Sequence, residues 1–165
     1  MSPNSKVNDP DVTGTRWLDA DQQRVWRNYI AMVRMLEEDL ERQMQADSGL
    51  SMNDYVLLMK LSEAPGRRLR MSELAADSVY SRSRLSHAVS RLEDAGWVQR
   101  TECPDDGRGT FAQLTDTGFA VLAAAAPGHA TTVHDLLFAP IGPDGCTALG
   151  FISDTVLATL TNQQP

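Results

Sequence analysis

MSELAADSVYSRSRLSHAVSRLEDAGWVQRTECPDDGRGTFAQLTDTG, residues 71–118, is the stretch that decides the fold of this 165-residue chain. Its first part predicts a short helix over about 71–78 and a turn at residues 79–80. A second helix is expected from Ser81, whose hydroxyl can cap it, to Ala95. Two helices joined by so short a turn are typical of a helix-turn-helix, which presents its second helix on the protein surface.

A hairpin is expected directly after this pair of helices. Gly96 ends the second helix, because glycine adopts the left-handed conformation at the least cost. The extended segments 97–101 and 110–114 are separated by Pro-Asp-Asp-Gly-Arg-Gly at 104–109, a loop suited to a hairpin. This order predicts a winged helix-turn-helix, which is a mainly α fold with a small β-hairpin wing.

The segments on either side of this unit are predicted to be helical and apolar on one face. A helix over about 19–46 carries apolar residues at three- and four-residue steps, and Ser51 can cap the helix after it. Beyond the hairpin, one helix begins at Thr115 and bends near Pro127, and a last one covers about 143–160. The predicted parts are a flexible segment at 1–18, an N-terminal dimerisation helix at 19–49, a winged helix-turn-helix DNA-binding domain at 50–118 and C-terminal dimerisation helices at 119–165.

The acidic charge of the chain lies mainly outside the winged unit. The net charge is −7, which is unexpected for a protein that approaches phosphates. Residues 66–108 carry eight arginines and seven carboxylates, a net charge of +1, so the remainder carries −8. The acidity would therefore not directly oppose nucleic acid at the winged unit.

The second helix of this unit carries side chains that can read DNA. A helix with one apolar and one polar side fits the major groove, where each base pair exposes a distinct pattern of donors and acceptors. Arg82 and Arg84 lie in the first turn, where the helix dipole is already positive and a phosphate or guanine would favour them. Solvated surface arginines are the alternative. The predicted major-groove contacts are Arg82, Ser83, Arg84, Ser86 and His87, and the predicted phosphate contacts are Ser81, Ser90 and Arg91.

The tip of the hairpin supplies a second predicted contact. Asp106 lies two residues before Arg108, across a glycine, and its carboxylate can hold the guanidinium in an extended pose. A preset arginine loses less side-chain entropy when it enters a narrow minor groove. An ordinary polar turn is the alternative, and the preceding helix-turn-helix favours the DNA contact.

From about Leu50 to Gly118 the chain resembles the MarR family of bacterial winged-helix regulators. The resemblance rests on RMSELA at 70–75, SRSR at 81–84, RLEDAGWV at 91–98, DGRG at 106–109 and LTDTG at 114–118. It implies a homodimer with interlocked N- and C-terminal helices, whose recognition helices meet consecutive major grooves of a near-palindromic site. It also implies that Arg108 is the wing-tip arginine of the minor groove and Asp106 its partner. Trp97 departs from the pattern, since many members carry a smaller aliphatic residue there.

A homodimer is also expected from the apolar stripes of the first and last helices. These helices flank a unit that is nearly self-sufficient, so their apolar faces need a partner. A core within one chain is the alternative. The predicted interface residues are Leu149, Ile152, Val156 and Leu160, together with the stripe of the first helix.

The resemblance also implies a small aromatic effector, bound between the dimer helices and the reading module. Residues that could line such a site are Trp26, Tyr29, Met59 and His129. Redox sensing by Cys103 is conceivable, but an inert thiol is the simpler interpretation. No metal site is predicted, because His129 and His134 are five residues apart and face different sides of a helix.

These observations favour a sequence-specific transcriptional regulator, a ligand-responsive repressor that acts as a homodimer on double-stranded DNA. A winged-helix module that only associates with proteins is the alternative. An enzyme is not expected, since the chain has no glycine-flanked nucleophile, phosphate loop or helical His-Glu metal motif. The longest apolar run, residues 119–126, is far shorter than the roughly 20 residues that cross a bilayer. We therefore expect a cytoplasmic protein with no cofactor and no membrane partner.

Overall fold

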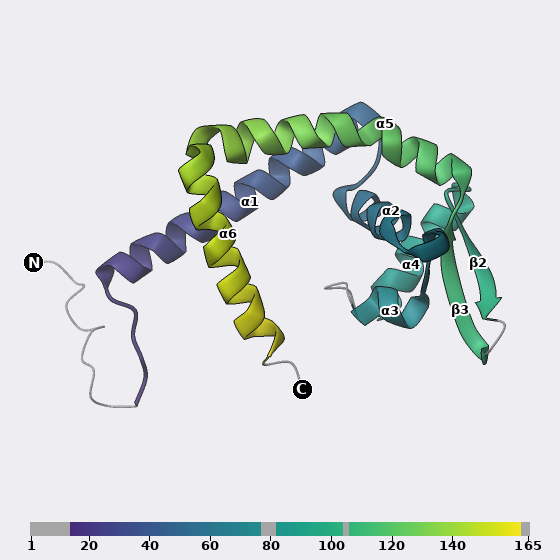
Figure 1. Ribbon diagram of the computed structural model, residues 1–165, viewed down its shortest axis with the longest axis horizontal. Coiled ribbons are helices and arrows are strands. Elements are labelled where there is room, and N and C mark those ends of the chain that lie inside the picture. Colours follow the sequence, from purple (N-terminus) through teal and green to yellow (C-terminus); the bar gives the residue numbers. More distant parts are fainter. Residues whose placement is uncertain (1–13, 77–81, 104–105, 163–165) are drawn as a thin grey trace, which may run out of the picture. The chain divides into compact units, whose positions relative to one another are not determined.

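The computed structural model describes residues 14–76, 82–103 and 106–162, without the side chains of residues 76, 82, 103 and 106–108. The described elements follow the predicted order, and the mainly α fold with a hairpin wing is confirmed (Figure 1). They are α1 (Ala20–Ser48), α2 (Met52–Glu63), η1 (Pro65–Arg67), β1 (Arg68–Arg70), α3 (Met71–Ala76), α4 (Arg82–Asp94), β2 (Val98–Cys103), β3 (Asp106–Leu114), α5 (Asp116–Val133), η2 (His134–Phe138) and α6 (Ala139–Thr161).

The chain divides into two compact units, residues 1–38 and 39–165, at a point within α1. In the first unit α1 exposes apolar side chains that include Val25, Trp26, Tyr29 and Ile30. In the second unit the core joins the end of α1 to α2, α3, α4, the sheet and the start of α5. Its fully buried members include Met44, Leu50, Leu57, Leu58, Leu61, Leu74, Leu85, Val89, Leu92 and Val98.

The sheet contains one strand more than the predicted hairpin. Its order is β1-β3-β2, and both pairings are antiparallel. Ala112 of the central strand β3 lies between Leu69 of β1 and Arg100 of β2. The predicted hairpin strands were also too short, because pairing continues to Cys103 opposite Asp106 after an irregularity beyond Glu102. The three residues of β1 carry too little alternation to be recognised locally, and only their pairing with β3 defines them as a strand.

The predicted cap of α2 is confirmed, and the start of α5 carries a cap of the same kind. The Ser51 hydroxyl accepts a hydrogen bond from the Asp54 N–H at 3.1 Å, and the Thr115 hydroxyl accepts one from the Gly118 N–H at 3.0 Å. Gly96 has a φ of 74°, the left-handed conformation expected where α4 ends. These bonds satisfy N–H groups that the first turn of a helix leaves without a helical partner.

The base of the wing is joined tightly to the start of α5. The Thr115 hydroxyl shares its one proton between the Gly96 carbonyl at 2.8 Å and the Trp97 carbonyl at 3.1 Å. A Cβ on Gly118 would lie 2.1 Å from the Trp97 carbonyl oxygen, so only glycine permits this approach. Nearby, the Arg67 guanidinium stacks on the Phe119 ring at 3.9 Å.

The helical run after the wing is longer than predicted. α5, η2 and α6 follow one another without a gap from Asp116 to Thr161, where a last helix beginning near residue 143 was expected. Gly142 interrupts the helical geometry inside this run, with φ 65° and ψ −173°. By length and composition alone the run could cross a membrane, with a mean hydropathy of 1.3 in its most apolar part. The expectation from residues 119–126 therefore understated its apolar length.

Candidate nucleic-acid interface

Helix α4 buries one face against the core and exposes the other. The buried residues are Leu85, Ala88, Val89 and Leu92, as predicted from the periodicity. Ser83, Arg84, Ser86 and His87 are exposed. Because the buried face is fixed by the core, the polar face of α4 has one defined orientation relative to the sheet. This face is narrow enough to enter a major groove.

Several predicted contacts lie outside the described residues. Ser81 is not described, and the side chains of Arg82, Asp106 and Arg108 are likewise outside the description. The backbone places Arg82 at the start of α4 and both Asp106 and Arg108 in β3. The assignment of these side chains to DNA stays a prediction.

Arg91 makes an ion pair that its sequence position did not reveal. Its Nη2 lies 3.1 Å from Asp54 Oδ1 in α2, and the other Asp54 oxygen accepts the Ser51 hydroxyl at 2.7 Å. The Arg91 side chain remains 59% exposed, whereas that of Asp54 is 15% exposed. Arg91 can therefore still meet a phosphate, but from a position held by α2.

Sequence reasoning missed Arg100, which holds β2 against α4. Its Nη1 donates to Glu93 Oε2 at 2.5 Å, and its Nη2 donates to the Ser86 carbonyl at 3.1 Å and to Ser90 Oγ at 3.0 Å. The Arg100 N–H donates to Glu93 Oε1 at 3.1 Å. Opposite charges seven residues apart across the turn at Gly96 are the signal that could have identified the pair.

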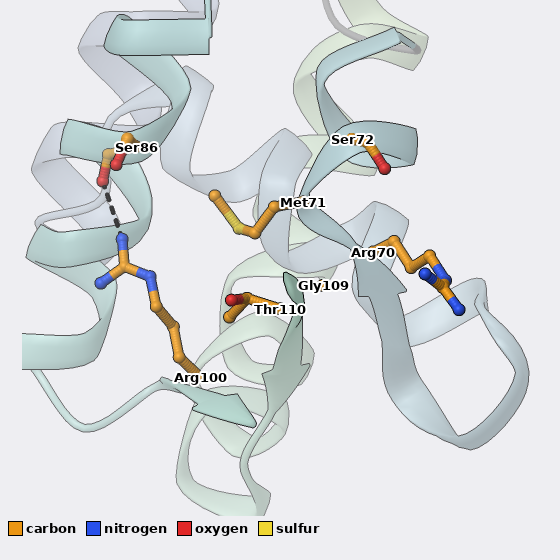
Figure 2. Close-up of a pocket in the computed structure, with 7 residues that line it drawn as sticks. All are labelled: Arg70, Met71, Ser72, Ser86, Arg100, Gly109 and Thr110. Atoms are coloured by element: carbon orange, nitrogen blue, oxygen red, sulfur yellow. Dashed lines mark hydrogen bonds between the residues drawn. The ribbon is translucent and has the colours of Figure 1, made fainter. Parts of the chain in front are cut away.

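A pocket of about 450 Å³ lies beside this contact. Figure 2 shows Arg100 reaching toward Ser86 on α4, with Met71 and Thr110 near the centre and Arg70 directed away from them. The pocket is lined by residues from five elements: the end of β1, the start of α3, and α4, β2 and β3. They are Arg70, Met71, Ser72, Ser86, Arg100, Gly109 and Thr110. The lining combines the hydroxyl groups of Ser72, Ser86 and Thr110 with the Arg100 guanidinium, which Glu93 already pairs.

The predicted effector residues fall into separate groups. Trp26 and Tyr29 stack on each other in the first unit, with ring centroids 6.1 Å apart. In the second unit Met59 packs against the core, and His129 lies against Tyr55 with ring centroids 4.7 Å apart. A single site formed by all four residues stays a prediction.

The Tyr55–His129 contact is partly removed from solvent, and its polar atoms are not all satisfied. Burial lowers the pKa of the His129 imidazole and raises the pKa of the Tyr55 hydroxyl. His129 Nδ1 and Gln43 Oε1 are buried and have no hydrogen-bond partner among the described residues. Burial therefore disfavours the charged imidazolium of His129.

The structure also bears on His134 and on the two cysteines of the chain. His134 is exposed and contacts Asp135 at 3.0 Å between Nδ1 and Oδ1. The Cys103 side chain is among those not described, and Cys146 is an exposed free cysteine.

The predicted dimer residues are not part of the core of a single chain. Ile152, Val156 and Leu160 are 55%, 51% and 55% exposed, and Leu149 is half-buried. Phe151 and Leu157 of α6 are exposed to an even greater extent. The exposure of Ile152, Val156 and Leu160 favours an interface over an intramolecular core, and the dimer contact itself stays a prediction.

The MarR family profile matches residues 50–110. A MarR family transcriptional regulator from Streptomyces coelicolor, solved in complex with DNA, is 50% identical; the match covers 92% of this chain and 93% of that one, with a TM-score of 0.85. A second MarR family regulator from the same organism, AbsC, is 39% identical over 90% of this chain and 100% of that one, also with a TM-score of 0.85.

Curated relatives match over a shorter part of the chain. The transcriptional regulator PecS of Dickeya dadantii is 30% identical over 93 residues, which are 56% of this chain and 55% of PecS. The transcriptional repressor MprA of Escherichia coli is 27% identical over 105 residues, which are 64% of this chain and 59% of MprA. The chain thus spans a little over half the length of these curated relatives.

Proposed function

Because the chain belongs to the MarR family, we propose that it is a DNA-binding transcriptional repressor that acts as a homodimer. The observation that carries this proposal is the exposed polar face of α4, held on the core by Leu85, Val89 and Leu92. The match over nearly the full length to a regulator solved in complex with DNA supports the same function. A module that only associates with proteins would not need this polar face.

In this proposal α4 enters the major groove and the wing meets the minor groove. Ser83, Ser86 and His87 offer hydrogen-bonding groups to base edges, and Arg84 offers a charged group to guanine or phosphate. Arg91, held by Asp54, is placed for the DNA backbone. Arg108 is the proposed minor-groove residue, with Asp106 as its orienting partner.

The test is binding to fragments selected from the source genome, followed by measurement of single variants. Arg108→Ala should weaken operator binding by about 1–3 kcal/mol and reduce the salt slope by about 1. Arg42→Ala is the matched control, because Arg42 lies on α1, is 72% exposed and pairs with neighbouring Asp39. Absence of salt-sensitive binding to any fragment would refute the proposed function and favour the protein-association alternative.

The exposed apolar face of α6 supports the homodimer. Ile152, Val156 and Leu160 occupy one stripe, and a second chain is the partner that most simply covers it. A membrane is the less favoured alternative, because aspartates at 116, 135, 144 and 154 recur along the run and each would be costly in a bilayer. We accordingly place the protein in the cytoplasm.

Release by a small molecule is the last part of the proposal. The pocket beside Arg100 is a second candidate site, besides the predicted residues Trp26, Tyr29, Met59 and His129. An aryl carboxylate bound there would contact Arg100 and Ser86 directly beside the reading face of α4. Titration with benzoate and phenol, followed by tryptophan fluorescence and by release of labelled operator, tests whether either class of compound binds.

A further inference from the structure

We infer that Glu93 and Arg100 form a brace that positions the wing for the minor groove, without either side chain having to read a base. This inference rests on the proposed function, because the wing matters only if the protein binds DNA. The two residues lie on different elements, Glu93 in the last turn of α4 and Arg100 in β2. We call their contacts, with Ser86 and Ser90, the helix–wing brace.

The brace spans about two turns of α4. Arg100 Nη2 donates to the Ser86 carbonyl at 3.1 Å and to Ser90 Oγ at 3.0 Å, and Nη1 donates to Glu93 Oε2 at 2.5 Å. Residues 86 to 93 extend over about 10 Å of helix axis. One planar guanidinium thus holds β2 along half the length of the recognition helix and fixes the angle between them.

Glu93 also closes the free edge of the sheet. β2 is an edge strand, since the strand order is β1-β3-β2. Its Arg100 N–H donates to Glu93 Oε1 at 3.1 Å instead of remaining unpaired at that edge. One carboxylate therefore binds both the backbone and the side chain of Arg100.

The position of Glu93 would be unfavourable without this partner. A carboxylate in the last turn of a helix lies at the negative end of the helix dipole. The Glu93 and Arg100 side chains are 37% and 28% exposed, so part of their charge is removed from water. A carboxylate that is disfavoured locally but makes two bonds to β2 indicates a role in joining the two elements.

The brace lies beside the proposed reading face and along the strand that leads to the wing. Ser86 lies on the proposed reading face with Ser83 and His87, and its backbone carbonyl is the group that Arg100 binds. On the other side, β2 pairs with β3, which contains Arg108. A wing held at a fixed angle to α4 needs no further ordering when its arginine enters the minor groove. Without the brace the wing must be ordered at the moment of binding, so the Arg108 contact in the minor groove contributes less to the affinity for DNA.

The test is a double-mutant cycle on operator binding with Glu93→Gln and Arg108→Ala. Glu93→Gln should lower operator affinity between about 2-fold and 30-fold. Charge alone predicts the opposite sign, because this variant removes one negative charge near DNA. In the Glu93→Gln background the affinity cost of Arg108→Ala should shrink by at least about threefold.

Two control substitutions and one further measurement separate positioning of the wing from an effect on general stability. Ser83→Ala, on the reading face of α4, should have the same cost with and without Glu93→Gln. Arg42→Gln, which breaks the exposed Asp39–Arg42 pair, should leave the cost of Arg108→Ala unchanged. Hydrogen exchange across 98–103 should be faster in Glu93→Gln than in the wild type, since the Arg100 N–H loses its charged acceptor.

Arg100→Lys is the second variant, in case Glu93→Gln does not fold. Lysine keeps the charge, and therefore the salt slope, but its single ammonium cannot bond to Ser86, Ser90 and Glu93 at once. It should likewise reduce the cost of Arg108→Ala. If Arg108→Ala lowers operator affinity equally in the wild type and in the brace variant, or lowers it in neither, the brace is overturned. The proposed function still holds in that case, provided that the wild type binds DNA. Failure of the wild type to bind any fragment refutes the proposed function itself.

Discussion

Substitution of Gly118 by alanine gives the most direct test of how the wing is joined to α5. The new Cβ would lie 2.1 Å from the Trp97 carbonyl oxygen and 2.8 Å from Leu114 Cδ1, whereas real Cβ contacts are essentially never under 3.0 Å. The backbone at one of the two positions must therefore move by about 0.9 Å, the difference between 3.0 and 2.1 Å. Backbone cannot rotate away from such a contact as a flexible side chain can.

The expected cost follows from three contributions. Overpacking of this kind costs about 1–3 kcal/mol. The movement also stretches the two hydrogen bonds that Thr115 donates to the Trp97 carbonyl, at 3.0 Å from N and 3.1 Å from Oγ1, each worth about 0.5–1.5 kcal/mol. Alanine regains about 1 kcal/mol through its higher helix propensity. We expect Gly118→Ala to lower the free energy of unfolding by about 2–4 kcal/mol.

Thermal and urea unfolding, followed by circular dichroism at equal protein concentrations, measures this cost. The Tm should fall by roughly 5–15 °C for a chain of this size. Gly150→Ala is the matched control, since a Cβ there has nothing within 4 Å. That variant should be unchanged or stabilised by up to about 1 kcal/mol. If Gly118→Ala proved as stable as Gly150→Ala, the close approach of Trp97 would not be a constraint on the fold.

Three further predictions follow from particular contacts. Burial lowers the pKa of His129 below the unfolded value of 6.5, so the stability from the neutral imidazole is present above that pH and is lost as the pH falls below it. Chemical denaturation between pH 8 and 5 should therefore show a weaker pH dependence for His129→Gln, and an unchanged profile would contradict the assignment. Ile152→Asp should convert the proposed dimer to a monomer in sedimentation velocity at micromolar concentration, since a carboxylate would enter an apolar interface; a wild type that is already monomeric contradicts the dimer. Arg67→Ala should cost about 1 kcal/mol in urea unfolding, because it removes the stacking on Phe119 at 3.9 Å, and no loss would show that the stacking adds nothing.

Local features of the chain were predictable because the interactions that create them lie within a few residues. The Ser51 and Thr115 caps bond to N–H groups three residues away, and Gly96 ends α4 through its own φ of 74°. The buried face of α4 follows from a periodicity that the core requires. These interactions depend on sequence spacing alone, so they could be read before any tertiary contact was known.

Features that join distant segments were missed. The strand β1 has only three residues and exists through its pairing with β3, more than 40 positions later. Arg91 was correctly placed on an accessible part of α4, but its partner Asp54 lies 37 residues away. No local pattern encodes which of several charged residues will meet when the chain folds.

The amino-acid sequence by itself determined the order of the helices and of the two hairpin strands, the Ser51 cap and the face that α4 turns to the core. Each of these depends on hydrogen bonds and apolar spacing within one or two turns. Only the tertiary structure decided that Arg100 bonds to α4 and that Gly118 packs against the Trp97 carbonyl. Such contacts depend on the distance and angle between separate elements, and packing of the whole core sets these quantities.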